Sequence, residues 1–555
     1  MKPIYCCVPI EFIQPWEQNE AIRQVKELGL GNMVMMPGTC HVGNSETDRQ
    51  FWKEQFPGLA EKIDAVPRFP ARPEHGMAAI LSLPLAFRLE QVRLCRELGL
   101  QIFGYLLGSC DFTPEERAQL DRAGEGIVWS ETLLCESTSL LHNTLSLEQL
   151  KQIDAMSLAS HAENHDLHAC GNISSIFDDP EALDFQAIQD WFIARFRRVY
   201  EELKPHWHGA VTSIEASVQM RLAMAAGTDA PILELVPHEP LRGLAAVRGA
   251  AKAYGAPMWG VHTAMGYYRA PTDAWTPERL RIANDLFYAG GASLFSECNL
   301  PLRNWGACSG FITIAASPDI RWAEKECRGF DDPICTRARE IMSDFYRFTQ
   351  FHPRPDGGPR VRMGFLLGNL DGWVGANQQT EHMWLVDRPG FLAADALKTW
   401  RHFERVFDSE SWYVPPKMYY WVADPAKPLH HGTPPCGQVD LVPAEAPVEV
   451  LQGYGTLAML GWNTMTEELY GKLLDFVKGG GTLYLSVPHL DTRTRTDRLP
   501  AFLCDGDVRD LCGVRIQGPG EHVEEVSLAE QTANPRCLFS QGTLYLEGAL
   551  LAQLE

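Results

Sequence analysis

Short apolar runs alternate with longer amphipathic stretches over the first 300 residues of the chain. In the amphipathic stretches, such as LAFRLEQVRLCRELGL at 85–100, apolar residues recur every three or four positions. This spacing is typical of helices that bury one face, whereas the short runs have the length and content of buried strands. The strand-like runs lie at 4–10, 32–36, 101–109, 126–131, 210–217, 230–239, 256–265 and 292–297.

This alternation predicts a (β/α)8 barrel, because parallel strands need helical crossovers and about eight of them close a barrel. Eight runs are clear, and a further short strand near Leu167 is left open. The alternative is an open, doubly wound sheet. No glycine-rich dinucleotide fingerprint opens the first helix, so the barrel is favoured.

A second α/β pattern begins after HPRPDGGPR at 352–360, a stretch whose prolines and glycines are typical of a linker. Strands are expected in VRMGFLLG, at 438–441 and at 456–460, and TEELYGKLLDFVKGGGTLYLSV predicts a helix followed by a strand. The expected domains are a barrel at 1–352, a smaller, flavodoxin-like α/β domain at 360–490, and a β-leaning segment at 491–555.

Composition narrows the class of partner. The chain carries 49 Lys and Arg against 71 Asp and Glu, a net charge of −22, which disfavours nucleic acid as a partner. Its 15 cysteines are irregularly spaced, as expected in a reducing compartment. No apolar run reaches the ~18 residues of a membrane span, and the first residues enter a strand rather than a signal peptide. We therefore expect a cytoplasmic protein without membrane contact.

Carboxylates gather where the predicted strands end. Barrel enzymes place their active sites at the carboxyl-terminal ends of the strands, and a carboxylate at the end of an apolar strand is costly unless it is paired or used. One such residue is commonly a structural ion-pair member, but five around one barrel favour function. These five are Glu131, Glu215, Glu234, Glu239 and Glu297.

Carboxylates and aromatic rings together point to sugar chemistry. Glycosidic bond cleavage uses one carboxyl group to protonate the leaving oxygen and a second to attack the anomeric carbon or activate water. Aromatic rings stack on the apolar faces of sugars, and His262 is a candidate to bond a hydroxyl group. Arg242 and Arg269 are candidates to keep carboxylates ionised. The candidate substrate-binding residues are Trp129, Glu239, Trp259, His262, Tyr267, Tyr268, Asn299 and Trp305.

The whole pattern resembles a known group of enzymes. A barrel with glutamates at its strand ends, followed by YGTLAMLGWNTMTEELYGKLLDFVKGGGTLYLSV in a smaller domain, resembles the clan A family 42 β-galactosidases and, more loosely, the family 164 β-mannosidases. The resemblance covers most of residues 1–490 as architecture, and in specific motif little beyond WSE, SIEAS and LFSECN. In those families the second domain resembles glutamine amidotransferases, has lost their chemistry and mediates trimerisation. Accordingly, no cysteine occurs at 456–465.

The resemblance implies a retaining, exo-acting β-glycosidase that hydrolyses short oligosaccharides, with Glu131 as the acid/base and Glu297 as the nucleophile. Ser130 stands where the wider clan carries an asparagine before the acid/base, so Glu215 remains the alternative acid/base. The resemblance also implies a trimer, with neither cofactor nor metal. A barrel that binds sugar without hydrolysing it is the second hypothesis.

Overall fold

The computed structural model describes most of the strands expected in the barrel and in the second α/β domain. Described are 3–65, 77–105, 113–131, 209–263, 276–297, 329–371, 438–518, 522–526 and 544–554, without 11–12, 14, 37–38, 44–45, 125–126, 216–219, 236–239, 355–357, 495–499 and 551–552. Ten separate positions between 186 and 204, and position 302, are also described. For some of these residues, including all of 127–131 and 215, the description is limited to the backbone.

Eight parallel strands form a closed barrel, which confirms the predicted (β/α)8 fold class. The hydrogen-bonded order is β1-β10-β9-β8-β7-β6-β5-β2, and β2 pairs with β1 to close the ring. Each of the eight predicted runs contributes one strand. Their bounds are β1 Tyr5–Pro9, β2 Met33–Met36, β5 Gln101–Tyr105, β6 Ile127–Glu131, β7 Ala210–Glu215, β8 Ala230–Leu235, β9 Gly260–Thr263 and β10 Leu294–Glu297.

The register of the barrel can be followed through its pairings. Glu131 of β6 pairs with Ile214, and the line continues through β8, β9 and β10 to Tyr5 of β1. Pro9, four residues after Tyr5, connects through β2 and β5 to Ile127, four residues before Glu131. A full circuit therefore returns to β6 eight residues lower, which is the shear of a TIM barrel.

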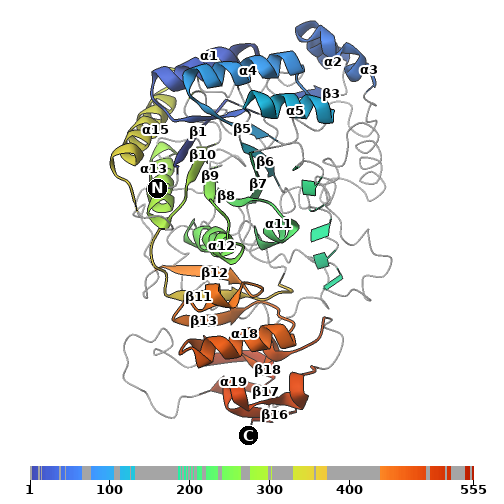
Figure 1. The fold of residues 1–555 in the computed structure, drawn as a ribbon, viewed down its shortest axis with the longest axis vertical. Coiled ribbons are helices and arrows are strands. Elements are labelled where there is room, and N and C mark those ends of the chain that lie inside the picture. The colour runs from blue at the N-terminus through green and yellow to red at the C-terminus, as the bar shows by residue number, and fades with distance from the viewer. Residues whose placement is uncertain are drawn as a thin grey trace.

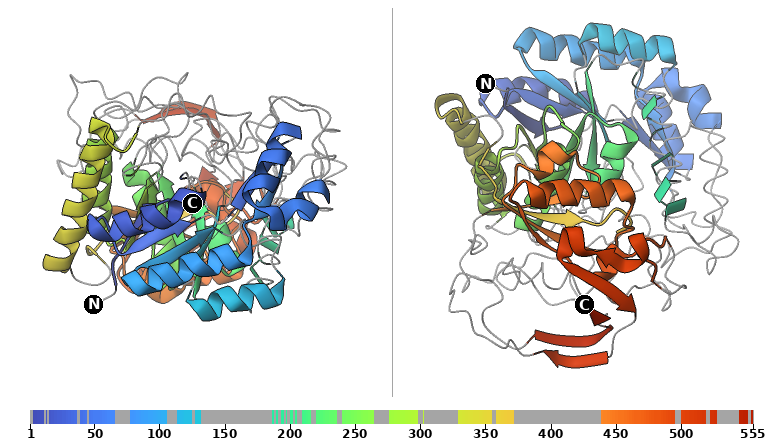
Figure 2. Two further views of the ribbon diagram at one scale, coloured as in Figure 1. Left: turned by 90° about the horizontal axis from the view of Figure 1, so that it is seen from above. Right: turned by 60° about the horizontal axis from the view of Figure 1, so that its bottom comes forward.

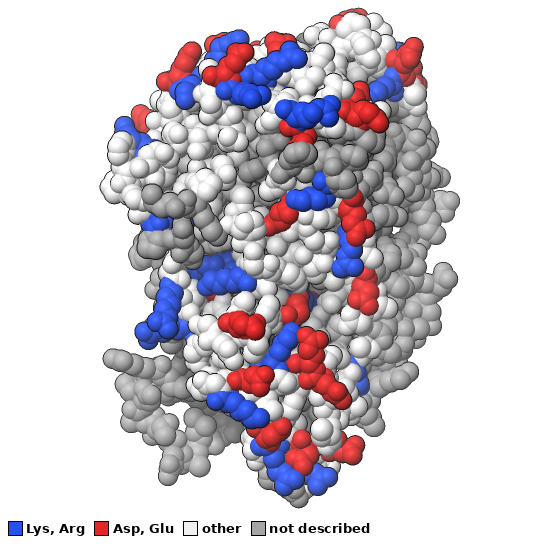
Figure 3. Space-filling model, in the orientation of Figure 1, with Lys and Arg blue, Asp and Glu red and all other residues white. Residues whose placement is uncertain are grey.

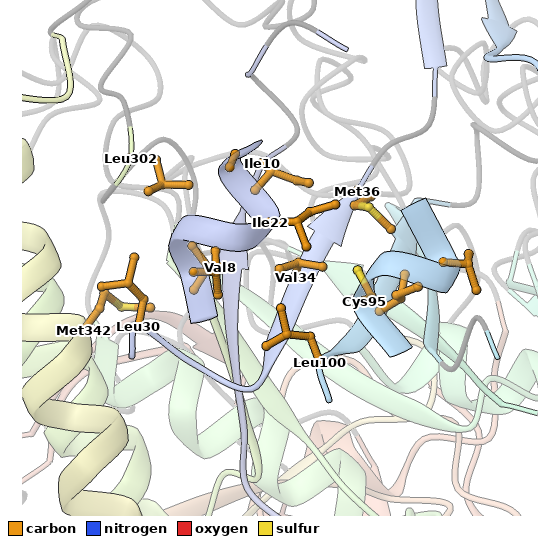
Figure 4. Packing of buried hydrophobic residues seen from close by; sticks show 14 of the residues in the cluster. Val8, Ile10, Ile22, Leu30, Val34, Met36, Cys95, Leu100, Leu302 and Met342 are labelled. Carbon is orange, nitrogen blue, oxygen red and sulfur yellow. The ribbon is translucent and has the colours of Figure 1, made fainter. Parts of the chain in front are cut away.

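Alternate residues of each strand face the barrel axis and the surrounding helices. The interior cluster contains side chains from six of the strands, and they are Tyr5, Cys7, Met33, Met35, Phe103, Ile214, Ile232 and Leu294. Their neighbours point outward: Val8 and Val34 pack with Ile22 and Cys95 of two outer helices (Figure 4). These inward residues fill the axis below the carboxyl-terminal ends of the strands.

Helices surround the barrel (Figure 1). They are α1 Pro15–Glu27, α4 Leu85–Leu98, α5 Pro114–Ala123, α11 Met220–Ala226, α12 Pro240–Ala253, α13 Thr276–Gly290 and α15 Pro333–Phe351. Thr113 caps α5 by accepting a hydrogen bond from the Glu116 amide, and Gly99 ends α4 in the left-handed region, as expected for a cap and a stop. The long insertion after β2 contains an antiparallel hairpin and two helices. These are β3 Thr39–Gly43, α2 Glu46–Gln55, the 3-10 turn η1 Pro57–Leu59, α3 Ala60–Ala65 and β4 Met77–Ser82.

A second parallel sheet, in the order β12-β11-β13-β14, confirms the smaller α/β unit. Its elements are β11 Met363–Leu367, β12 Val439–Pro443, α17 Val448–Leu451, β13 Thr456–Leu460, α18 Glu467–Lys478 and β14 Thr482–Tyr484. The remaining elements are short and mainly β, as predicted. They are η8 Val487–Leu490, η9 Leu503–Gly506, β15 Asp507–Val508, α19 Arg509–Cys512, β16 Val514–Gly518, β17 His522–Val526, β18 Leu544–Leu550 and β19 Gln553–Leu554. They lie at the end of the molecule away from α1 and α4 (Figure 2).

Helix α12 lies between the barrel and the second sheet. Leu244 and Val247 pack with the outward residues of β8, while Leu241 and Ala245 pack with Leu441 of β12. One helix therefore buries two faces, which explains why its sequence is apolar and small almost all round. On the face shown in Figure 3, acidic and basic side chains are interspersed over both units.

Candidate active site

Three of the predicted carboxylates are the last residues of their strands, at the mouth of the barrel. Glu131 is the last residue of β6, Glu215 the last of β7 and Glu297 the last of β10. Glu297 is buried, with 2% of its surface exposed, whereas the description of Glu131 and Glu215 is limited to their backbone. Because each of the three is the last residue of its strand, they lie at the end of the barrel where active sites of this fold form.

A row of polar residues crosses three neighbouring strands inside the barrel. Glu234 of β8 pairs in register with His262 of β9, which pairs with Ser296 of β10. The residue directly before each of them in its strand points outward and packs against the helices. Because side chains alternate along a strand, all three of these polar residues face the barrel axis. Glu234 and His262 are both 3% exposed. The structure thus brings one carboxylate, one imidazole and one hydroxyl into a single interior row.

His262 is neutral and fixed within this row. Its Nδ1 lies 2.8 Å from Ser296 Oγ. Burial lowers the pKa of His262 to about 3, so the ring stays uncharged at neutral pH. In a neutral ring one nitrogen donates and the other accepts. The Ser296 hydroxyl, by donating to Nδ1 or accepting from it, therefore sets whether Nε2 donates or accepts.

Two of the other carboxylates, Glu215 and Glu297, share the parity of outward residues. Glu297 pairs with Thr263 and follows Phe295 by two, and Phe295 packs in the outer cluster of α12, α13 and α15. Glu215 pairs with Leu233, which packs in the same outer cluster. Register partners in a parallel sheet share a face. Their positions in the strands are therefore on the helix side of the wall, whereas Glu131 pairs with the inward Ile214.

The aromatic candidates are distributed differently. Trp259 comes before the first residue of β9, at the opposite end of the barrel from the mouth, and packs with Tyr288 and Phe345 in the outer cluster. The structure does not bring Trp259 to the mouth, because the strand begins only after it. Trp129 lies in β6, where the description covers the backbone alone. The remaining predicted residues lie outside the described part: Glu239, Tyr267, Tyr268, Asn299 and Trp305.

Ser296 was not singled out by the sequence, and Glu234 was noted there only as one of five carboxylates. A polar residue in an otherwise apolar run, as in APILEL, is the signal that marks Glu234. No comparable signal marks Ser296 in LFSE, because serine is common near strand ends. Arg242, a candidate for keeping carboxylates ionised, lies in the first turn of α12, and Arg269 lies outside the described residues.

Two further observations concern metal sites and membrane spans. Among the described residues, His, Cys, Asp and Glu side chains form no group of three that could hold a metal ion. Within that same part of the chain, no helix combines the length and the apolar character needed to cross a bilayer.

Comparisons with known proteins add similarity of shape alone. No protein-family model and no curated protein matches the sequence. Among solved structures, a GH42 β-galactosidase aligns with 94% of this chain and 76% of its own, at 12% identity and a TM-score of 0.44. The GH113 β-mannanase of Alicyclobacillus acidocaldarius covers 62% of this chain and 98% of its own, at 10% identity and a TM-score of 0.33. D-psicose 3-epimerase from Clostridium cellulolyticum H10 aligns over the same shares, at 8% identity and a TM-score of 0.30.

The three similar structures include a sugar epimerase as well as glycoside hydrolases. With identities and TM-scores this low, they carry no argument about the reaction of this chain. The class that the structure defines is a (β/α)8 barrel joined to a smaller parallel α/β sheet, and it rests on the strand order itself.

Proposed function

We propose that this chain is a glycoside hydrolase whose active site lies at the mouth of the barrel. The observation that carries the proposal is the buried Glu234 in the interior row with His262 and Ser296. An ionisable side chain buried at the active end of a barrel is a candidate for a role in chemistry. Glu131, at the end of β6 and in register with the inward Ile214, supplies a second carboxylate position.

The proposed reaction is hydrolysis of a β-glycoside with retention, acting from the non-reducing end of short oligosaccharides. Glu131 donates a proton to the leaving oxygen, a second carboxylate attacks the anomeric carbon, and Glu131 then activates the water that releases the sugar. For the second carboxylate the chain offers Glu297, predicted from the sequence, and the inward Glu234. Galactose and mannose are the first sugars to test.

A sugar-binding barrel without hydrolysis is the alternative function. Buried carboxylates and a neutral imidazole hold hydroxyl groups well, so the row of Glu234, His262 and Ser296 suits binding as much as catalysis. Use of Glu215 as the acid/base is the alternative mechanism. Its pairing with the outward Leu233 favours Glu131 over Glu215.

We also propose that the chain acts as a homotrimer in the cytoplasm, without metal or cofactor. These proposals derive from the family resemblance and from the irregular cysteines of the sequence. Mass photometry of the purified protein tests the trimer, for which we expect a species of three times 62.1 kDa.

The function is tested by hydrolysis of a panel of 4-nitrophenyl glycosides, α and β, of galactose, mannose, glucose, fucose and glucuronic acid. We expect release of 4-nitrophenol from one β-glycoside. Binding of a sugar without release from any glycoside would favour the binding protein. Release from an α-glycoside would support glycoside hydrolase activity but contradict the proposed specificity for β-glycosides.

A further inference from the structure

Glu234 occupies an inward position of the barrel wall at the level of the mouth. Ile232, two residues earlier in β8, belongs to the interior cluster, while Leu233 and Leu235 belong to the outer cluster. Strand alternation therefore directs Glu234 toward the axis. It lies one residue before the end of β8, so no further inward residue of that strand stands above it.

The register puts Glu234 and Glu131 in the same layer of the barrel. Along the line of paired residues, the height on the barrel axis drops by eight residues over the eight strands, which is one residue per strand. The residue at the same height as Glu131 is therefore found by moving one residue toward the carboxyl end for each strand crossed. Glu131 pairs with Ile214, which pairs with Ile232. Two strands from β6, the level position is two residues after Ile232, which is Glu234. A TIM-barrel layer takes one residue from each alternate strand, and β6 and β8 are alternate strands.

The separation between these positions suits two cooperating carboxylates. Eight strands about 4.8 Å apart and tilted by about 36° enclose a backbone circle about 15 Å across. Positions a quarter-turn apart, such as 131 and 234, are then about 11 Å from each other at the backbone, whereas β6 and β10 are half a turn apart, at about 15 Å. A backbone separation of about 11 Å between two inward positions is compatible with the carboxyl separation of about 5–5.5 Å that retaining glycosidases use.

From this arrangement we infer that Glu234, rather than Glu297, is the second catalytic carboxylate and the partner of Glu131. The inference rests on the proposed function. The Glu234 carboxylate forms a bond to the anomeric carbon as the bond to the leaving oxygen breaks, and that oxygen takes the proton of Glu131. Water then attacks the anomeric carbon, Glu131 takes a proton from it, and the ester bond to Glu234 breaks. The sum of both steps is hydrolysis.

The inference is tested first with three variants of the full chain, measured on the glycoside that the wild type hydrolyses, and then with two alanine variants, Glu234→Ala and Glu297→Ala, assayed with azide. Glu234→Gln keeps the side-chain volume and removes the charge, and Glu234→Asp keeps the charge and withdraws it by one methylene. Glu27→Gln, at an exposed position of α1, is the matched control. The thermal unfolding transition of each variant is compared with that of the wild type to check that the fold is kept.

We expect Glu234→Gln to lower kcat/KM by about 10³-fold or more and Glu234→Asp by about 10²-fold, while Glu27→Gln stays within twofold of the wild type. Azide, a small external nucleophile, should restore activity to Glu234→Ala. The product of this rescued reaction should be a glycosyl azide. If Glu234→Gln does not fold, the aspartate variant decides.

Three results would overturn the inference in distinguishable ways. If the wild type is active and the folded Glu234 variants stay within tenfold of it, the inference fails and the glycosidase stands. If the wild type releases nothing from the panel, the proposed function fails and the catalytic role of Glu234 fails with it. Azide rescue of Glu297→Ala instead of Glu234→Ala would return the nucleophile to Glu297.

Discussion

His262 is a buried histidine whose ring is held by a serine. Its Nδ1 is 2.8 Å from Ser296 Oγ, and burial lowers its pKa to about 3. A second buried histidine, His489 after the second sheet, has its pKa lowered to about 4, mainly by burial. At neutral pH both rings are therefore uncharged hydrogen-bonding groups rather than cations.

This neutrality predicts the direction of the pH dependence of stability. Since the pKa of His262 is lower in the folded state than in the unfolded chain, the unfolded state binds more protons between pH 6.5 and about 3. The free energy of unfolding should thus decrease as the pH is lowered through this window, by up to about 1.4 kcal/mol per pH unit for this residue. Urea unfolding at pH 7 and pH 5 should show a smaller loss for His262→Asn than for the wild type. Equal losses would contradict the pKa assigned to His262.

The site shows what the sequence can and cannot predict at this scale. A glutamate in an apolar run marks a strand end, so Glu131 and Glu297 are correctly located at ends of β6 and β10. Which face a residue takes depends on the register, and one residue of shift reverses it. That is why the sequence alone could not separate Glu234, with inward parity, from Glu297, with outward parity. Their catalytic roles stay predictions.

At the scale of elements, the strands were the most predictable part of the molecule. The predicted strand at 456–460 has the bounds of β13, and the run at 438–441 became β12, which continues to Pro443. The hairpin of β3 and β4 in the long insertion was not predicted. Its strands pair antiparallel with each other outside the barrel, so they lack the strand-and-helix rhythm by which the other strands were found.

Helix α12 and strand β12 approach each other closely at Gly249. A Cβ atom at Gly249 would overlap the backbone carbonyl oxygen of Leu441. We predict that Gly249→Ala lowers the free energy of unfolding by about 1–3 kcal/mol, because the helix must move away from the sheet. Gly471→Ala in α18 is the control. Among the described residues, no atom beyond its chain neighbours and its own helix backbone lies within 4 Å of the added Cβ, and alanine should stabilise that helix by about 0.5–1 kcal/mol. Denaturant unfolding of both variants measures the difference, and a neutral Gly249→Ala would contradict the close packing.

At the scale of the whole molecule, a buried charge cluster joins the two units. Arg248 Nε of α12 donates to Asp440 Oδ1 of β12 over 2.6 Å, and Lys252 Nζ lies 2.7 Å from Asp440 Oδ2. Arg248 and Asp440 are fully buried. Burial alone would raise the pKa of Asp440, but attraction to the two cations outweighs it and lowers the pKa. Barrel and sheet should therefore unfold together.

We predict that Asp440→Ala lowers the free energy of unfolding by about 3–5 kcal/mol, because Arg248 is left as a buried charge without its carboxylate. Asp344→Ala removes an acid from an exposed pair with Arg347 and should cost less than about 1 kcal/mol. Fluorescence and circular dichroism should report one coincident unfolding transition in the wild type. Separate transitions for the barrel and the second sheet would contradict the joined structure.

In the proposed reaction, a carboxylate at the barrel mouth forms a covalent bond with the sugar. The most direct test is to react the protein with the 2-deoxy-2-fluoro analogue of the glycoside that it hydrolyses, since the fluorine slows release of the glycosyl-enzyme. Digestion and mass spectrometry then locate the sugar on the chain. We expect one sugar per chain, attached to Glu234. Attachment to Glu297, or hydrolysis that proceeds without any attachment, would contradict it.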